Sequence, residues 1–136
     1  MNSDDIERVR QGWAVAAADP EALTTAFYGH LFRIDPTSRA LFGEDMAAQR
    51  GKLALTLDFI MGVLDDTDTL VPAARDLARR HVGYGLRPDQ YSHAGAALIH
   101  ALEDQLGTAF GAEDRAAWER VYGALEAVIL DTISET

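Results

Sequence analysis

The sequence predicts an all-α fold on three observations. Apolar residues recur at spacings of three and four residues along nearly the whole chain, and no convincing period-two alternation typical of β-strands is present. Aspartate or proline stands at the start of several of these segments, and glycines follow two of them. With 136 residues, the chain is expected to form one domain over residues 1–136, large enough to enclose a cofactor.

The first helix is expected to follow Ser3 as its N-cap. A serine hydroxyl can accept a hydrogen bond from the unpaired N–H groups of the first turn, and Asp4 and Asp5 favour the positive end of the helix. One face of this helix carries Ile6, Val9, Trp13 and Ala16. That face is predicted to pack into the core because its residues recur with the helical period.

The next two segments each open with an aspartate followed by a proline. Asp19 can cap a helix whose first residue is Pro20, because proline lacks the N–H that would have no partner there. The apolar residues of this second helix are Leu23, Phe27, Leu31 and Phe32. Asp35 and Pro36 repeat the arrangement, which predicts a short turn of helix ending near Phe42.

A strongly apolar helix is predicted from Gln49 to Leu64. Its main stripe consists of Leu53, Leu57, Ile60 and Leu64. Its other faces also carry apolar residues, namely Ala54, Leu55, Phe59, Met61 and Val63. Because a helix that is apolar on most sides avoids water, it is expected to be buried in the middle of the fold.

Three more helices are expected after it. Pro72 is predicted to begin a helix that runs to about His81, where Gly83 and Gly85 can adopt the left-handed conformation that ends it. The next helix, which starts at Pro88, carries Ala94, Leu98 and Leu102. The last helix, after a break at 107–111, carries Trp118, Val121, Tyr122, Leu125 and Ile129. Six long helices and one or two short ones are therefore predicted.

Composition and charge exclude several classes of function. The formal net charge is −10 at pH 7, which repels nucleic acid and anionic membrane surfaces. No run reaches the roughly 18 to 20 apolar residues that span a bilayer, and the start is acidic where a secretory signal would be basic. Cysteine is absent, which excludes disulfides and cysteine metal sites. A cytoplasmic protein with no nucleic-acid or membrane partner is expected.

The sequence contains few motifs for chemistry. It has neither of the glycine-rich phosphate-binding motifs, and it lacks the Glu-x-x-His pairs of di-iron bundles. The reversed pair His100 and Glu103 is interpreted as a solvated helix face. The four histidines are His30, His81, His93 and His100. Taken singly, each is more readily explained as a surface or satisfied core residue than as a ligand.

Four fragments together resemble a known family. In chain order they are FYGHLFRIDPTSRALF, QRGKL, LARRHVGYGLRPDQYSHAGAAL and AAWERVYGAL. They resemble bacterial single-domain haemoglobins and the globin domain of flavohaemoglobins, from Ile6 to about Ile129. The most specific part is His81 followed ten residues later by Tyr91. The resemblance implies a globin fold, a haem b cofactor and diatomic ligands such as dioxygen, nitric oxide and carbon monoxide.

The resemblance also implies roles for residues on the two sides of the haem. His81 matches the histidine that ligates the iron, and its second ring nitrogen needs an acceptor, for which the Leu77 carbonyl is available one turn back. Tyr28 matches the distal tyrosine and Gln49 the distal helix residue, with Arg50 as an alternative one residue later. A phenol and an amide can donate to the partial negative charge of bound dioxygen. Without the resemblance, Tyr28 would be interpreted as a core aromatic residue and Gln49 as an exposed polar residue.

Further matched positions form the walls of the haem pocket. Phe42 matches the phenylalanine that packs flat on the haem. The positions that match the apolar lining are Leu53, Leu57, Leu86, Ala94 and Tyr122. Such a lining excludes water and so slows oxidation of ferrous iron. Lys52 and Arg80 match residues placed to meet the haem propionates, and the alternative for both is a solvated cation near a helix end.

The proximal side departs from the flavohaemoglobin pattern. Tyr91 matches a tyrosine of a hydrogen-bond network in which a glutamate of the last helix contacts the histidine. The family spacing places that glutamate at Ile133 here, and the nearest acid, Glu135, sits on a different helix face. Without the carboxylate, less electron density is pushed toward iron, so peroxidase-like oxygen activation is not expected.

The favoured function is reversible binding of dioxygen for storage, delivery or sensing. The alternative is nitric oxide dioxygenation, which would need a separate reductase because no flavin or nicotinamide domain is present in the sequence. A haem-free helical interaction module is a third possibility. It is disfavoured because His81, Tyr28, Phe42 and Gln49 all stand at matching positions.

Overall fold

The computed structural model describes residues 1–134, which form six α-helices and two short 3-10 segments without a strand. The elements are α1 (Ser3–Ala16), α2 (Pro20–Ile34), η1 (Pro36–Leu41), α3 (Met46–Gly62), α4 (Thr67–Gly83), α5 (Pro88–Leu106), η2 (Gly107–Ala109) and α6 (Ala112–Ser134). The predicted all-α class and the predicted number of helices are confirmed. Within residues 1–134, no helix combines the length and apolar character needed to cross a membrane.

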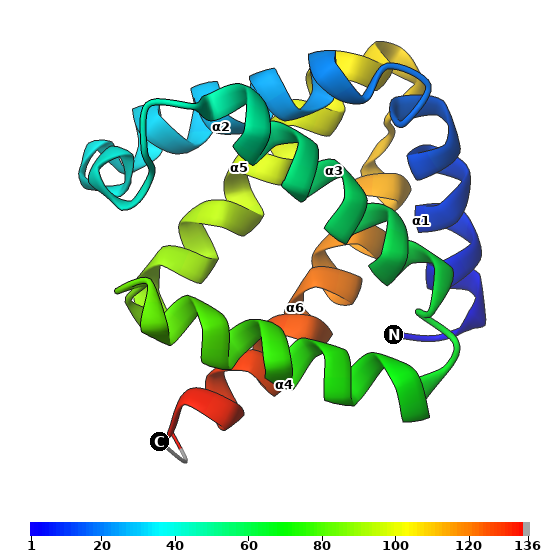
Figure 1. Cartoon of the computed structure of the whole chain (residues 1–136). Coiled ribbons are helices and arrows are strands. Elements are labelled where there is room, and N and C mark those ends of the chain that lie inside the picture. The colour runs from blue at the N-terminus through cyan, green and yellow to red at the C-terminus, as the bar shows by residue number, and fades with distance from the viewer. Residues whose placement is uncertain (135–136) are drawn as a thin grey trace.

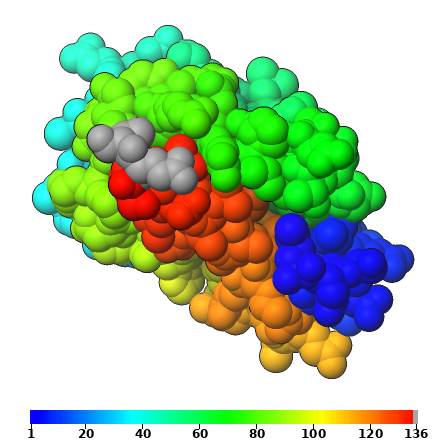
Figure 2. Space-filling model, turned by 90° about the horizontal axis from the view of Figure 1, so that it is seen from below, coloured from blue at the N-terminus to red at the C-terminus, as the bar shows by residue number. Residues whose placement is uncertain are grey.

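The helices pack in crossed pairs rather than as a parallel bundle. α2 packs against α5, α4 against α6, and α1 against α6. Figure 1 shows α3 and α4 running across the same side of the molecule, one above the other, with α5 and α6 behind them. Figure 2 shows α4, in green, directly beside the orange and red residues of α6. The position of α4 in the fold therefore depends on the position of α6.

Helix starts follow the predicted caps in α2 and η1 but not in α1. The Asp19 carboxylate accepts from the Ala22 N–H at 3.1 Å, with Pro20 as the first helical residue. In α1 the N-cap is Asn2, so the prediction of Ser3 was wrong by one residue. The reason is a reciprocal pair of bonds: the Asn2 side chain accepts from the Asp5 N–H at 2.8 Å, and the Asp5 carboxylate accepts from the Asn2 N–H at 3.4 Å.

The predicted start of α4 at Pro72 was also wrong, because the helix begins at Thr67. Pro72 lies inside the helix, where its missing N–H leaves the carbonyl four residues earlier without its usual donor. The extra turn before the proline carries Leu70, which is 5% exposed and belongs to the core. Burial of this apolar side chain favours continuation of the helix ahead of the proline.

The expectation that the apolar helix α3 lies in the middle of the fold is contradicted. Met61 is its one buried residue, whereas Leu55 is 75% exposed and Phe59 is 52% exposed. Leu53 and Leu57 are half-buried against the core. α3 lies on the outside of the molecule and contacts α1 and α2 with one side. The apolar residues on the opposite side therefore meet solvent.

A glycine determines how closely α5 approaches α6. At Gly95 an added Cβ would lie 2.5 Å from Cε1 and 2.8 Å from Cδ1 of the Tyr122 ring. The Tyr122 hydroxyl donates to the Tyr91 carbonyl in the turn before Gly95. The ring of Tyr122 thus occupies the space that a side chain at position 95 would need.

Gly95→Ala is expected to destabilise the protein by about 1–3 kcal/mol, because the new methyl group overlaps an aromatic ring between two packed helices. Gly123→Ala in α6 is the matched control, since nothing lies within 4 Å of its added Cβ. It should stabilise by up to about 1 kcal/mol because alanine favours helix more than glycine does. Urea unfolding curves measure both, and equal stability of the two variants would contradict this account of α5–α6 packing.

Candidate functional site

His81 stands in the last turn of α4 with one ring nitrogen fixed. Its Nδ1 lies 2.7 Å from the Leu77 carbonyl oxygen, which is the contact predicted from the helix end. Since a carbonyl can only accept, Nδ1 carries the proton and Nε2 keeps its lone pair in the neutral ring. No residue within 1–134 forms a hydrogen bond with Nε2. His81 is half-buried and so oriented as a metal-ligating imidazole requires.

The other three histidines each lie against a carboxylate. The nitrogen–oxygen pairs are His30 with Asp104 at 2.6 Å, His93 with Asp35 at 3.3 Å and His100 with Glu103 at 3.8 Å. These rings therefore have acidic partners within the protein, which supports their interpretation as satisfied or solvated residues. Among the four histidines, His81 alone has a backbone carbonyl as its partner within residues 1–134.

Tyr28 in α2 is buried and hydrogen-bonded to the side chain of Gln49 in α3. Burial raises the pKa of its phenol above the ordinary value of 10, while the bond to Gln49 and the charge of Arg50 act in the opposite direction. The phenol is therefore protonated at neutral pH.

Aromatic rings hold Tyr28 in place. Its ring centroid lies 5.0 Å from that of Phe27 and 5.4 Å from that of Phe42, with interplanar angles of 80° and 77°. Phe32 completes the group at 5.8 Å. Edge-to-face arrangements of this kind are favourable for aromatic pairs. The structure thus brings together Tyr28 and Phe42, two residues that the sequence placed on the same pocket.

Gln49 and Arg50, the two candidates for the distal residue of α3, have different partners. Gln49 is the residue that hydrogen-bonds Tyr28. The Arg50 guanidinium instead lies 4.0 Å from a carboxylate oxygen of Glu21. The geometry therefore places Gln49 beside the phenol, and Arg50 contributes its charge from further away.

The predicted lining residues are half-buried rather than fully buried. Phe42, Leu53, Leu57 and Ala94 pack against the edge of the main core, and Leu86 packs against a second cluster beneath α4. Each of these side chains therefore touches the protein on one side and is partly uncovered on the other. A flat apolar group with one axial nitrogen ligand suits this arrangement, and haem is such a group.

In the described part of the chain, the side chains of the predicted propionate residues, Lys52 and Arg80, have no polar contact with the other site residues. The Arg80 guanidinium bonds to Asp76 of its own helix, with Nε 2.9 Å from the carboxylate oxygen. Lys52 is exposed and forms no ion pair within residues 1–134. The alternative of solvated cations near helix ends therefore stays open for both residues.

Tyr91 in α5 lies beside His81, with the two ring centroids 6.2 Å apart. Its hydroxyl is buried without a hydrogen-bond partner in the described part of the chain, and burial raises its pKa to about 12. The surrounding cluster is apolar and includes Ile129 and Ile133. The position that matches the family's glutamate thus packs among apolar side chains. Glu135 lies outside the described residues.

Two site features were not anticipated from the sequence. Tyr122, predicted as a pocket wall, lies over Gly95 and donates to the Tyr91 carbonyl, so it supports Tyr91 through its backbone. Tyr84 has its ring 6.0 Å from that of His81 and is 68% exposed. Its position three residues after His81, on the same side of a helix end, was the available signal for Tyr84.

The all-α fold, together with His81 on one side of the candidate site and Tyr28 and Gln49 on the other, indicates a class of protein. An imidazole with a fixed tautomer on one helix and a phenol–amide donor pair on two others are typical of a helical haem protein. Residues 25–129 match the family model described as Globin. The chain belongs to the globin family.

Known proteins of this family resemble the chain over different lengths. The flavohemoprotein of Rhodopirellula baltica is 27% identical over 96% of this chain, which spans only 33% of that protein. The neuroglobin of Tetraodon nigroviridis is 25% identical, over 93% of this chain and 89% of its own length. The structure of a bacterial globin from Campylobacter jejuni superposes with a TM-score of 0.84 at 20% identity, covering 98% of this chain and 97% of that chain. The globin resemblance is thereby confirmed.

Substitutions of Tyr91 and Tyr122 should separate the contributions of their two hydroxyl groups to stability. Tyr91→Phe removes a buried hydroxyl that has no hydrogen-bond partner within residues 1–134, so we expect stability to be unchanged or slightly increased. Tyr122→Phe removes the donor to the Tyr91 carbonyl and should cost about 1 kcal/mol. Thermal and urea unfolding measure both variants, and a larger loss in Tyr91→Phe than in Tyr122→Phe would show that the Tyr91 hydroxyl is bonded in solution.

Proposed function

We propose that this globin binds haem b with His81 as its axial ligand and binds dioxygen reversibly, for storage, delivery or sensing. The observation that carries the proposal is the buried Tyr28 phenol, hydrogen-bonded to Gln49 and held among aromatic rings. Family membership supports haem as the cofactor. When bound, haem supplies the iron at which diatomic gases bind.

In this proposal His81 contributes a preorganised nitrogen. The bond from Nδ1 to the Leu77 carbonyl fixes both the tautomer and the ring orientation before any cofactor enters. The half-buried apolar residues on α3 and α5 exclude water from the other face of the site. In this proposal the protein supplies one nitrogen ligand and a lining of half-buried apolar side chains.

Tyr28 and Gln49 give the pocket its selectivity among gases. Bound dioxygen carries more negative charge than bound carbon monoxide, so a protonated phenol favours dioxygen. In the proposal, Gln49 orients the phenol through their hydrogen bond, and the Tyr28 O–H donates to the bound ligand. Slow release of dioxygen is the expected result.

His81→Ala should abolish the absorption spectrum of the haem-loaded protein, and added imidazole should restore it in part by replacing the lost ligand. His100→Ala is the matched control, because that ring is partly exposed and lies beside Glu103 on the far end of α5. Its spectrum should equal that of the wild-type protein. An unchanged spectrum in His81→Ala would exclude His81 as the ligand.

Tyr28→Phe should speed dioxygen dissociation by about tenfold or more, because a hydrogen bond to a charged acceptor contributes roughly 1.5–3 kcal/mol. Carbon monoxide dissociation should change much less. Stopped-flow measurements on Gln49→Leu and Arg50→Leu then compare the two distal assignments. A larger effect of Arg50→Leu would reverse the assignment of Gln49.

Nitric oxide dioxygenation is a second candidate, favoured by the likeness to flavohemoproteins over 92–96% of this chain. The reaction converts dioxygen and nitric oxide to nitrate, and one electron must be resupplied after each turnover. We propose a separate reductase as its source. Nitric oxide mixed with the oxygenated protein should yield nitrate in stoichiometric amount, and survival of the oxygenated spectrum would exclude this activity.

A further inference from the structure

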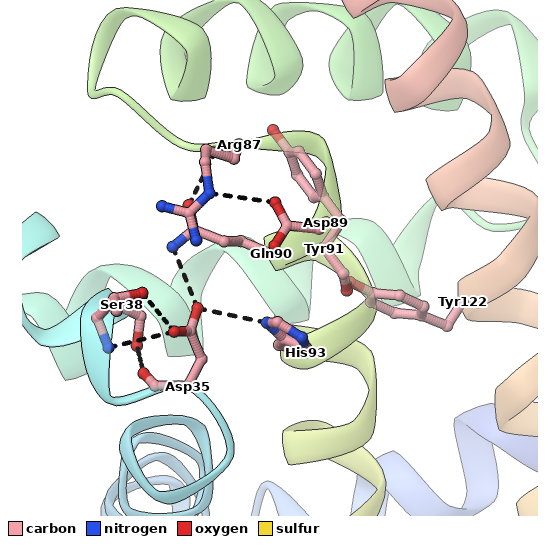
Figure 3. Close-up of polar contacts among 9 residues, drawn as sticks. Asp35, Ser38, Arg87, Asp89, Gln90, Tyr91, His93 and Tyr122 are labelled. Carbon is pink, nitrogen blue, oxygen red and sulfur yellow. Dashed lines mark hydrogen bonds and ion pairs between the residues drawn. The ribbon is translucent and has the colours of Figure 1, made fainter.

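One buried carboxylate joins two corners of the molecule that are distant in sequence. Asp35 follows α2 and caps η1, and it is 6% exposed. One of its carboxylate oxygens accepts from the N–H of Thr37 at 3.2 Å and from the Thr37 hydroxyl. The other lies 3.2 Å from Nε2 of Gln90 and 3.3 Å from Nδ1 of His93, both in α5 (Figure 3). Asp35 therefore bridges η1 and the first turns of α5.

Gln90 extends this connection to the corner between α4 and α5. It is 3% exposed, and its side-chain oxygen accepts from the Arg87 N–H at 2.8 Å. In the same corner the Leu86 N–H donates to the His81 carbonyl at 3.1 Å. The residue after Gln90 is Tyr91, whose ring lies beside that of His81. Gln90 thus holds the segment that carries the proximal side of the site.

The segment on the other side of Asp35 carries part of the distal side. η1 leads directly to Phe42, whose ring packs edge-to-face on Tyr28. A movement of η1 would therefore move the ring that holds the distal phenol. Asp35 lies between the segment of Phe42 and the segment of Tyr91.

Helix capping alone does not account for these contacts. Asp19 and Asp45 cap α2 and α3 through a single side-chain acceptor bond each, and both are exposed. Burial of a carboxylate is costly unless donors surround it, so the site of Asp35 needs Gln90 and His93 as well as Thr37. Thr37, Gln90 and His93 together overcome the effect of burial and lower the pKa of Asp35 to about 2. The carboxylate is charged at neutral pH, which strengthens each bond.

We propose that Asp35 and Gln90 are positioning residues that set the separation of Phe42 on the distal side from Tyr91 and His81 on the proximal side of the haem pocket. The inference rests on the proposed haem-binding function. It adds two residues that touch neither the iron ligand nor the distal phenol. Loss of their bond should change both sides of the pocket together.

The test compares Asp35→Asn with Asp5→Asn. The new amide at position 35 presents N–H groups to a site lined by donors, so the bond from Gln90 or from Thr37 is lost. Asp5 is the matched control because it is 4% exposed, also accepts from a backbone N–H, and binds Arg120 at 2.7 Å on α6, away from the pocket. Both variants should lose stability. Because both variants lose stability, a lower free energy of unfolding does not distinguish them, and the test uses other measurements.

Two readouts report on the pocket of the haem-loaded protein. In Asp35→Asn the iron–histidine stretching frequency should shift, and dioxygen dissociation should change by about tenfold, the scale of one lost charged hydrogen bond. Asp5→Asn should leave both unchanged. Gln90→Leu keeps the Asp35 carboxylate and should shift the stretching frequency and the dissociation rate in the same direction as Asp35→Asn. If Asp35→Asn does not fold, Gln90→Leu is the variant that tests the proposal.

A third readout needs no haem. In the haem-free protein, hydrogen exchange at 36–42 and 84–91 should accelerate together in Asp35→Asn and Gln90→Leu but not in Asp5→Asn. Exchange that matches the Asp5→Asn pattern would overturn the positioning role. If the protein bound no haem, the proposed function would fail while hydrogen exchange still decided this inference.

Discussion

The close contact of α5 with α6 at Gly95 is the constraint on which the site depends. The Tyr122 ring lies where a side chain at position 95 would be, and its hydroxyl binds the backbone of Tyr91. This contact sets the position of α6 against the core. α4 packs on α6, so the helix that carries His81 takes its place from a glycine in a different helix. A steric requirement at the contact of α5 with α6 thus affects the position of the helix that carries His81.

Polarity differs between the two sides of the proposed pocket, and this difference is the reason for proposing binding rather than activation of dioxygen. On the distal side, burial keeps the Tyr28 phenol protonated and Gln49 orients it. On the proximal side, Tyr91 and Ile133 belong to an apolar cluster. The acceptor for the His81 ring N–H is the neutral carbonyl of Leu77, which donates less electron density than a carboxylate would. Within residues 1–134, the His81 ring thus has a backbone carbonyl and no carboxylate as its hydrogen-bond partner.

Contacts between residues close in sequence could be predicted from the sequence alone. Asp19 and Pro20 form the expected helix start because capping depends on neighbours two or three residues away. The bond from His81 to Leu77 spans one helical turn, so the helix itself brings these two groups together. Tyr28 lies in a fragment that resembles the globin family, so its place in the site could also be predicted from the sequence.

Contacts between distant segments were decided only by the tertiary structure. The choice of Gln49 over Arg50 beside the phenol depends on how α3 is rotated against α2, and the exposure of Phe59 depends on which side of α3 meets the core. The bond from Gln90 to Asp35 joins residues 55 positions apart. Periodicity shows that a helix has an apolar face, but it does not show which neighbour covers that face. The amino-acid sequence therefore predicted the number of helices, the caps of α2 and η1 and the candidate iron ligand, because these depend on neighbours within one helical turn. Packing decided the start of α4 and which side chains of different helices meet, because these depend on residues far apart in the chain.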